Sequence, residues 1–565
     1  MTDTTFVPTN VHEDGTQSAD IQTTPHEDKV GCEMHILPSK VIPVIFLPGI
    51  MGSNLKLSPA RQQKLEKDTD ISWRPEATLE TLAMINDDPA ARQQILDPEQ
   101  TDVDTYDPGN PQSDKRHKNV SKVAFIYNPN GVEGTTDATH RARQRGWSEV
   151  FYSSYGDLLR RLEAHLNPLC QLGQPAAGWQ QILDNDPGKW GATSSGPALT
   201  RDDLKKITDA WYPVHAMGYN WLRSNGESAK VVAQRIRALI TRYQSMNFKC
   251  EKVIVVTHSM GGLVGRALIH PDFGNAEDVV AGIIHGAMPA TGAAAAYKRI
   301  RAGFEGSGVK GYFFKKVVGD TGPKVTAVLA NAPGGLQLLP SERYGSDWLK
   351  TRIGDQEVTL GPNTGDPYAD IYTVQDKWYR LINPEWVNPA KLKTSGLDLT
   401  MKKIYDSQEF HRKIATHYHP LTYLSYGADE NDKGHFAWGE VVWEVGKAPF
   451  FGGGAKQGLG LEKLDVVPQP EQWQNLEDKG EGVIRLTDGV DMQRFGVRIE
   501  PPAEAGDGTV PKRSAVDPVD QGKPKLSFKG GGYEHQDSYK DQAVLNSTLY
   551  GIASIARDGF TWWTK

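Results

Sequence analysis

One short segment near the middle of the chain constrains the fold more than any other. Val253 to Val256 is a run of apolar, β-branched residues that is typical of a buried parallel strand. The sequence Thr-His-Ser-Met-Gly-Gly follows at 257–262, and apolar residues with helical spacing come next. Where a strand turns sharply into a helix at a serine, the hydroxyl group is pushed out of the sheet. We therefore predict that Ser259 is a nucleophile at the end of a central strand.

The residues that flank Ser259 fit such a turn with one departure. Gly261, two residues after the serine, leaves room for close packing of helix against strand. Thr257 stands two residues before the serine, where glycine is usual. The alternative is a Ser-Met-Gly-Gly turn that binds a phosphate or caps a helix. The β-branched strand before the turn and the amphipathic helix after it favour the nucleophile.

Strands and helices alternate around this turn. An apolar run at 41–47 predicts a buried strand, which ends in a glycine-punctuated loop at 48–53. Apolar residues with helical spacing predict a helix over 228–245, and the run at 279–284 predicts another buried strand. The alternation predicts an α/β protein with a mostly parallel central sheet.

Long polar stretches interrupt this pattern and set the predicted domain boundaries. Residues 1–38 are polar and have almost no apolar periodicity. The region 301–419 is longer than a connection needs, so we predict an inserted cap or lid there. The chain then divides into a flexible N-terminal arm, 1–38; a core, 39–300 and 420–565, with insertions at about 58–145 and 428–500; and the cap or lid region, 301–419.

Two late residues complete a catalytic set for the serine. In the strand–serine–helix arrangement the acid follows the serine in the chain and the histidine comes last. Asp507 lies in a Gly-Asp-Gly-Thr-Val loop, and His535 precedes the last predicted helix. We predict that His535 takes the proton of Ser259 and that Asp507 orients the imidazole and stabilises its cation.

Other interpretations stay open at these two positions. Asp507 could belong to a solvent-exposed loop, and His535 could cap a helix or lie buried in the core. The chain has 15 histidines, so position in the chain decides more than residue type. Three other carboxylates could serve as the acid: Asp429, which follows a predicted strand at 421–426, and Glu534 and Asp537, which flank the histidine.

Two backbone amides are candidates for the oxyanion hole that a serine nucleophile requires. One is the N–H of Met260, directly after the serine. The other is the N–H of Ile50 in the loop Pro48–Gly52, because the second donor comes from the loop after an earlier strand. The alternative is a tight turn that uses its glycines only for positive φ angles.

Patterns for metals and disulfides are weak. His417 and His419, with His411 nearby, could suggest a metal site, but no matching carboxylate or cysteine pattern stands beside them. No EF-hand spacing supports calcium. We therefore predict no metal and no other cofactor, and calcium is left open. The cysteines form neither a disulfide framework nor a zinc pattern and favour a reducing compartment: Cys32, Cys170 and Cys250.

Charge and hydropathy exclude several functional classes. Lys and Arg number 63 and Asp and Glu number 70, so the net charge is only −7, with no basic footprint for nucleic acid. No apolar stretch approaches the roughly 18 residues that a transmembrane helix needs. The first residues lack the basic and apolar regions of a secretory signal. We expect synthesis in the cytoplasm without a signal peptide.

Several segments, in order along the chain, resemble the lecithin:cholesterol acyltransferase-like branch of the α/β-hydrolases. They are PVIFLPGIMGSNL, YNWLRSN, VVTHSMGGLVGRAL, LTYLSYG, GDGTVP and a histidine before the last helix. Three others, IIHGAMPATGAAAAYKR, PGGLQLLPSERYG and YEHQDSY, are similar to the bacterial type VI secretion lipase effectors. The matching segments span about residues 41–300, 330–345, 420–430 and 500–556.

This resemblance implies an α/β-hydrolase with large inserted cap elements and carries the family's nucleophile onto Ser259, its acid onto Asp507 and its base onto His535. It implies an antibacterial phospholipase delivered by type VI secretion into the periplasm of a rival bacterium. The partners would be membrane phospholipid as substrate, a cognate immunity protein and a secretion spike protein, with no nucleic acid. The residues themselves suggest which part of the cap contacts lipid: Phe304, Tyr312, Phe313 and Phe314 are apolar. The alternative is that these side chains pack the cap onto the core.

Residues and resemblance together predict a serine lipase or phospholipase. Two enzymatic alternatives remain: a lipid acyltransferase, in which an alcohol replaces water, and a cytoplasmic esterase. A non-enzymatic binding protein would require a complete set of serine, aspartate and histidine in the right order to be a coincidence.

Overall fold

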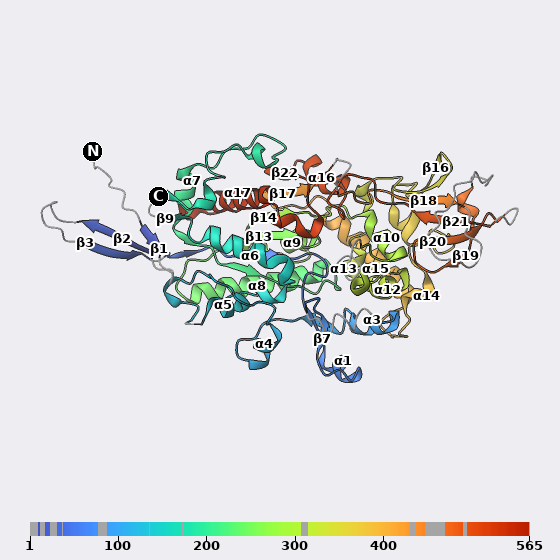
Figure 1. Cartoon of the computed structure of the whole chain (residues 1–565), viewed down its shortest axis with the longest axis horizontal. Helices are drawn as coiled ribbons and strands as arrows, with labels where there is room; N and C mark the ends of the chain where they lie inside the picture. The colour runs from blue at the N-terminus through green and yellow to red at the C-terminus, as the bar shows by residue number, and fades with distance from the viewer. Residues whose placement is uncertain are drawn as a thin grey trace.

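The computed structural model describes most of the chain. The described residues are 9–11, 17–22, 31–36, 38–76, 87–134, 136–171, 174–306, 315–429, 435–446, 469–489 and 494–563. In Figure 1 the molecule is elongated, with a parallel sheet in its middle, a second large sheet at one end and a small sheet near the N-terminus at the other.

A six-stranded parallel sheet forms the core. Its strand order is β12-β5-β13-β14-β17-β22, and every neighbouring pair is parallel. Almost every residue of these strands is buried, as expected for a parallel sheet covered on both faces. The α/β class with a mostly parallel sheet is therefore confirmed. The strands are β5 (Val44–Leu47), β12 (Val214–Ala216), β13 (Val253–His258), β14 (Val280–Gly286), β17 (Thr422–Gly427) and β22 (Leu526–Gly530).

Helices cover both faces of this sheet. The helices that contact it most extensively are α6 (Tyr152–Leu166), α9 (Gly261–Ile269), α16 (Lys512–Asp520) and α17 (Gln542–Asp558), and α8 (Asn225–Ser245) packs against α9. Successive strand residues point to opposite faces. Val255 of β13 packs in the apolar cluster that includes α8 and α9, whereas Val256 packs in the cluster that includes α6 and α17. A continuous apolar run in the sequence therefore serves both faces of the sheet.

The predicted elements near the N-terminal side of the sheet are present with shifted ends. The predicted helix over 228–245 is α8, and it begins three residues earlier. The predicted strand at 41–47 is divided in two: β4 (Lys40–Val41) pairs with β11 (Ala210–Trp211), and β5 follows. Pro43 lies between β4 and β5, and proline has no N–H to donate to a strand ladder.

A second six-stranded sheet forms the right-hand end of the molecule in Figure 1. Its order is β16-β15-β18-β21-β20-β19, and only the β15–β18 pair is parallel. Two strands come from the region 301–419 and four from 428–500, so two regions that the sequence presents as separate insertions build one sheet. The strands are β15 (Leu349–Ile353), β16 (Gln356–Gly361), β18 (Val441–Gly446), β19 (Gln474–Asp478), β20 (Val483–Thr487) and β21 (Arg494–Ile499).

Helices of the region 301–419 and its neighbours lie between the two large sheets (Figure 1). They are α10 (Ala294–Ala302), α12 (Gly322–Leu329), α13 (Pro333–Leu336), α14 (Pro384–Val387) and α15 (Leu397–Ile414). Arg301 Nη2 in α10 pairs with Asp478 Oδ2 of β19 at 2.6 Å, and both side chains are buried. Arg92 of α3 (Pro89–Ile95) donates to Val317 O at 2.7 Å, which joins the region 58–145 to the region 301–419.

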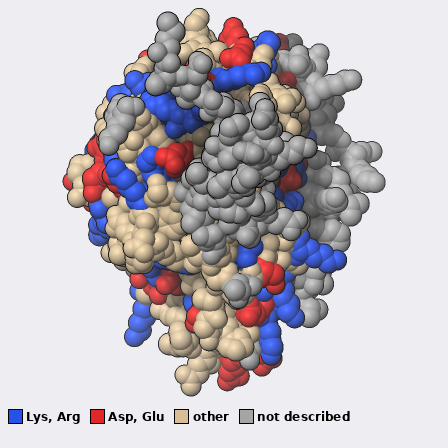
Figure 2. Space-filling view, turned by 90° about the vertical axis from the view of Figure 1, so that its left-hand side faces the viewer, with Lys and Arg blue, Asp and Glu red and all other residues tan. Residues whose placement is uncertain are grey.

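The remaining elements are short. The N-terminal arm contains an antiparallel sheet of β1 (Thr9–Val11), β2 (Gln17–Gln22) and β3 (Gly31–Ile36). Figure 2 faces this end of the molecule, where basic and acidic side chains occur on the same face. None of the described helices is long and apolar enough to cross a bilayer.

The remaining short strands and helices are β6 (Leu55–Leu57), β7 (Ile71–Trp73), β8 (Thr101–Val103), β9 (Cys170–Gln171), β10 (Gln174–Pro175), α1 (Pro59–Lys64), α4 (Pro111–Arg116), α5 (Ala138–Gln144) and α7 (Arg201–Ile207).

Candidate active site

Ser259 lies at a strained turn between β13 and α9. Its φ angle is +54°, in the left-handed region that residues other than glycine rarely adopt. Such strain persists only where the surroundings hold it, and it is found mostly at functional sites. The turn places Ser259 at the carboxyl end of a central strand, and the residue is only 6% exposed. The strand, the turn and the helix therefore have the predicted arrangement.

Two glycines allow the turn to approach the loop after β5. A Cβ atom on Gly261 would lie 2.5 Å from Pro48 O and 2.6 Å from Leu47 O. A Cβ atom on Gly49 would lie 2.9 Å from Ser259 Cβ. Real Cβ atoms do not come this close to other atoms, so both positions require glycine for steric reasons. The loop at 48–53 and the serine turn are thus in direct contact.

The substitution Gly261→Ala is expected to lower the free energy of unfolding by about 1–3 kcal/mol. The reason is that the added methyl group meets two backbone carbonyl oxygens, which cannot rotate away as a side chain would. Urea unfolding of the variant and the wild type measures the difference. The matched control is Gly109→Ala, where the nearest atom is the tip of the Asp107 side chain at 3.3 Å. Equal destabilisation by both substitutions would contradict the steric explanation.

The three predicted catalytic side chains lie together. Ser259 Oγ and His535 Nε2 are 2.8 Å apart, and His535 Nδ1 and Asp507 Oδ2 are 2.8 Å apart. The carboxylate can only accept, so Nδ1 carries the proton of the neutral ring and Nε2 accepts from the serine hydroxyl. The other carboxylate oxygen, Asp507 Oδ1, accepts from the amides of Thr509 at 3.1 Å and Val510 at 2.8 Å. This geometry can deprotonate the serine hydroxyl as it attacks a carbonyl carbon.

The environment of Asp507 keeps its carboxylate ionised. Burial by itself raises the pKa of Asp507, but the charge of His535, the hydrogen bond from that ring and the two loop amides outweigh burial, so that the net pKa is below the ordinary value. A lowered pKa stabilises the folded state above the unfolded pKa of about 3.9, and this contribution is lost as the pH falls through the folded pKa. The acid therefore remains charged throughout the neutral range.

The other three candidate acids make different contacts. Asp429 Oδ2 accepts from the Gly532 amide at 3.0 Å, and Asp537 Oδ1 pairs with Lys540 at 2.7 Å. Glu534 is exposed, directly before the histidine. The contact with the histidine ring is made by the aspartate of the Gly-Asp-Gly-Thr-Val loop, as the order of residues in the sequence predicts.

Aromatic side chains from separate segments hold the loop after β5. Each makes a hydrogen bond with its backbone: Tyr219 Oη donates to Pro48 O at 2.8 Å, Gly49 N donates to Tyr155 Oη at 3.2 Å and Trp73 Nε1 donates to Met51 O at 2.7 Å. Within the described part of the chain, the amides of Ile50 and Met260 have no hydrogen-bond acceptor. Neither amide is therefore engaged by the described part of the protein, and their role as oxyanion donors stays a prediction.

Sequence reasoning missed the residues that hold this loop. Tyr219 lies in the YNWLRSN segment, so a family motif marked its position but not its role. Trp73 belongs to a predicted insertion, and Tyr155 belongs to a helix that has no motif of its own. No local pattern reveals that these side chains, far apart in the sequence, converge on one loop.

The histidines of the predicted 411–419 group make separate contacts. His411 Nε2 donates to Gln337 O at 2.8 Å, and His419 Nδ1 accepts from Leu421 N at 3.0 Å. The ring of His417 packs against another histidine ring at a centroid distance of 4.7 Å. Over the residues that the structure describes, no group of three or more His, Cys, Asp or Glu residues could hold a metal ion.

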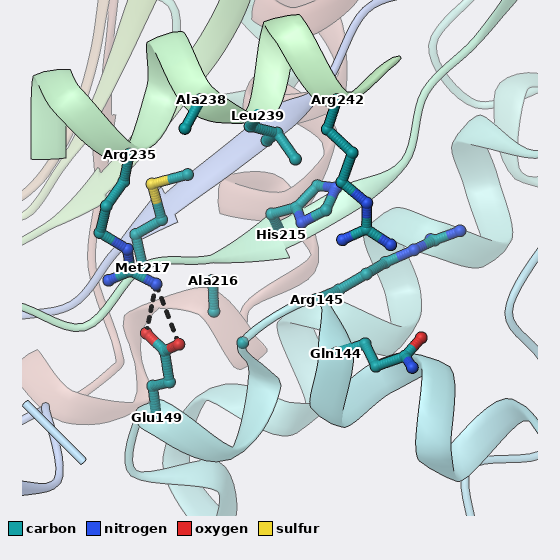
Figure 3. A pocket seen from close by; sticks show the side chains of 11 residues that line it. Gln144, Arg145, Glu149, His215, Ala216, Met217, Arg235, Ala238, Leu239 and Arg242 are labelled. Atoms are coloured by element: carbon teal, nitrogen blue, oxygen red, sulfur yellow. Dashed lines mark hydrogen bonds and ion pairs between the residues drawn. The ribbon is translucent and has the colours of Figure 1, made fainter. Parts of the chain in front are cut away.

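A pocket of about 280 Å³ lies at the edge of the parallel sheet (Figure 3). It is lined by Gln144, Arg145, Gly146, Glu149, His215, Ala216, Met217, Arg235, Ala238, Leu239 and Arg242, and the candidate catalytic residues are not among them. Arg235 pairs with Glu149 at 2.7 Å. Arg145 pairs with Glu133 at 2.6 Å and with Glu163 at 3.0 Å. Most of the charge at this pocket is thus neutralised by neighbouring side chains.

The fold and the site together define a class of protein. A parallel sheet carries a serine at a sharp turn into a helix, and an aspartate and a histidine on later loops meet that serine. This is the α/β-hydrolase fold.

Comparisons with known proteins agree with this class. Residues 221–331, which include Ser259, match a family model described as a PGAP1-like alpha/beta domain. Over nearly its whole length the chain is similar to Tle4 in the crystal structure of the Tle4-Tli4 complex, with a TM-score of 0.71 and 27% sequence identity. The match covers 92% of this chain and 99% of that chain. No curated protein matches the sequence. The predicted resemblance to type VI secretion lipase effectors is thereby confirmed, and the matches support a hydrolase of the lipase or esterase kind.

Proposed function

We propose that the protein is a serine carboxylic-ester hydrolase that cleaves acyl esters of membrane phospholipids. The observation that carries this proposal is the pair of 2.8 Å contacts that joins Ser259, His535 and Asp507 at the carboxyl end of the central sheet. The similarity to Tle4 supports a lipase. The amides of Ile50 and Met260, which have no acceptor among the described residues, support acyl transfer through a tetrahedral oxyanion.

The proposed reaction has two halves. Ser259 Oγ attacks the ester carbonyl carbon while His535 Nε2 takes its proton, and the amides of Ile50 and Met260 donate to the oxyanion. The carbon–oxygen bond to the lysolipid breaks, and His535 returns the proton to the leaving oxygen. Water, deprotonated by the same histidine, then attacks the acyl-enzyme carbonyl carbon. The bond from that carbon to Ser259 Oγ breaks, His535 returns the proton to Oγ, and the fatty acid is released. Asp507 stays ionised throughout and stabilises the imidazolium.

A lipid acyltransferase is the second candidate within this chemistry. The first half of the reaction is identical, and an alcohol replaces water in the second half. The products distinguish the two enzymes: a hydrolase releases free fatty acid, whereas an acyltransferase moves the acyl group to a lysolipid or sterol acceptor. We propose hydrolysis, because the chain is similar to a lipase over nearly its whole length.

We further propose that the enzyme acts as an antibacterial toxin in the periplasm of a target bacterium, after delivery by type VI secretion. A cognate immunity protein and a secretion spike protein are the proposed partners. The similarity to Tle4, whose structure was solved as the Tle4-Tli4 complex, supports a protein partner. For lipid contact we propose the cap: Phe304 is partly buried, with the Arg299 guanidinium over its ring, whereas 312–314 lie outside the described residues.

Expression in a test bacterium is expected to separate the compartments. With an added periplasmic signal the wild type should kill the cells and Ser259→Ala should not, because killing requires ester hydrolysis at the membrane. Cytoplasmic expression should be much less toxic. Viable counts and the free fatty acid content of the membranes measure the two effects. Equal toxicity in both compartments, or none in either with active enzyme present, would contradict the periplasmic role and leave a cytoplasmic esterase.

A further inference from the structure

A fully buried histidine stands directly before the proposed nucleophile. Its ring contacts the backbone of the proposed base on one side and a tyrosine that bonds the loop after β5 on the other. His258 is the last residue of β13, and its ring has no exposed surface. Its Nε2 lies 3.0 Å from His535 O, the backbone carbonyl of the proposed base. Its Nδ1 lies 3.0 Å from Tyr155 Oη, and that oxygen accepts from the Gly49 amide at 3.2 Å.

The partners of His258 determine which atoms carry protons. A carbonyl oxygen only accepts, so Nε2 must carry the hydrogen that is donated to His535 O. Burial, followed by the proximity of His535, lowers the pKa of His258 to about 3, so the ring is neutral and its Nδ1 is bare. Tyr155 Oη therefore donates to Nδ1 and accepts from Gly49 N–H. The hydrogen bonds form one directed chain from Gly49 through Tyr155 and His258 to His535.

We propose that His258 and Tyr155 are positioning residues. They hold the loop with the proposed oxyanion donors and the proposed base, His535, at fixed positions relative to Ser259. This inference rests on the proposed serine hydrolase function. The loop after β5, the turn at Ser259 and the loop that carries His535 come from distant parts of the sequence. The His258 imidazole bonds the His535 backbone directly and the loop after β5 through Tyr155, and His258 precedes Ser259 in the sequence. Acyl transfer requires the oxyanion donors and the base to be placed within a fraction of an ångström relative to the nucleophile.

The neutral state of His258 serves the same purpose. The rings of His258 and His535 lie 4.9 Å apart between centroids. During the reaction His535 becomes an imidazolium, and a second positive charge at this distance would oppose its formation. A neutral ring donates to the backbone carbonyl of the base and places no second charge beside it. A histidine that merely fills the core would not need both ring nitrogens bonded to parts of the site.

Three substitutions separate the hydrogen bond on the Tyr155 side of the His258 ring from the hydrogen bond on its His535 side. Tyr155→Phe removes the hydroxyl between Gly49 and His258 with little change in shape. His258→Gln can keep a donor near Nε2 and loses the acceptor at Nδ1, whereas His258→Asn keeps an acceptor near Nδ1 and loses the donor. The control is Tyr212→Phe, because Tyr212 is equally buried and its hydroxyl also bonds a backbone group, Ile207 O at 2.7 Å, away from the site.

The expected result is a loss of kcat without a comparable change of KM. Tyr155→Phe and His258→Gln should each lower kcat per active site by about 10- to 100-fold, because small displacements of catalytic groups have effects of this size. Active sites are counted by titration with a fluorophosphonate, so that misfolded protein does not enter the rate. The double variant should have a kcat only slightly lower than that of either single variant, because both substitutions remove the same hydrogen bond between Tyr155 Oη and His258 Nδ1. Tyr212→Phe should leave kcat unchanged.

Two outcomes overturn the inference, and they differ from failure of the proposed function. If Tyr155→Phe lowers the melting temperature but leaves kcat per active site at the wild-type value, as for Tyr212→Phe, the residues are only structural. If the effects of Tyr155→Phe and His258→Gln on kcat are fully additive, the two residues do not act through one connected set of hydrogen bonds. Should the His258 variants fail to fold, the kcat of Tyr155→Phe decides alone. Hydrolysis that survives Ser259→Ala would instead overturn the proposed function.

Discussion

Ser259→Ala is expected to lower the rate of p-nitrophenyl ester hydrolysis by about 10⁴-fold or more, with a melting temperature close to that of the wild type. Ser259 Oγ is the proposed attacking atom, and its only hydrogen bond among the described residues is to His535. Its removal therefore abolishes the chemistry but costs the folded state little. Steady-state kinetics and thermal unfolding of the purified variant measure the two quantities.

The control for this substitution is Ser547→Ala. Ser547 is also buried, but its hydroxyl donates to Val544 O in α17, outside the site. We expect this variant to keep full activity and wild-type labelling by a fluorophosphonate probe, whereas Ser259→Ala should lose the label. Turnover near the wild-type rate in Ser259→Ala would end the proposal that this serine is the nucleophile.

Asp507→Asn is expected to lower activity by roughly 10⁴-fold while the protein still folds, by analogy with the aspartate of serine proteases. The amide cannot stabilise the imidazolium, and its NH₂ group favours the wrong tautomer of His535. An amide oxygen can still accept from the Thr509 and Val510 amides, so the loop keeps its hydrogen bonds. The measurements are kcat/KM and urea unfolding.

Asp429→Asn provides the matched comparison, because Asp429 is also buried and lies on the loop after β17. Its carboxylate bonds the Gly532 amide, and asparagine can still accept that bond. We expect less than a tenfold loss of activity. A reversed result, with Asp429→Asn inactive and Asp507→Asn active, would move the acid to the end of β17.

The strand–serine–helix turn was predictable because its signals are local. A β-branched run, a serine and two glycines within ten residues are enough to predict β13, the turn and the start of α9. The strained φ angle at Ser259 and the steric need for Gly261 explain why this residue pattern marks the turn. Chain order then pointed to Asp507 and His535, because the fold places the acid and the histidine on loops after later strands.

The contacts between distant segments were not predictable in the same way. Nothing in the residues around Tyr155 indicates that its hydroxyl lies between Gly49 and His258. Likewise, the regions 301–419 and 428–500 have the polar, interrupted pattern of separate insertions, yet β15 pairs with β18 to make one sheet. Such pairings depend on which surfaces the folded core brings together.

The sequence by itself determined the α/β class, the turn at Ser259 and the order of the three candidate catalytic residues. These features follow from residue periodicity, glycine placement and chain order, all of which are local or one-dimensional. Only the tertiary structure decided which carboxylate meets His535, which side chains hold the loop after β5 and how the regions 301–419 and 428–500 join. The physical reason is that a hydrogen bond of about 3 Å between residues far apart in the chain depends on the packing of the whole core, and no local pattern encodes it.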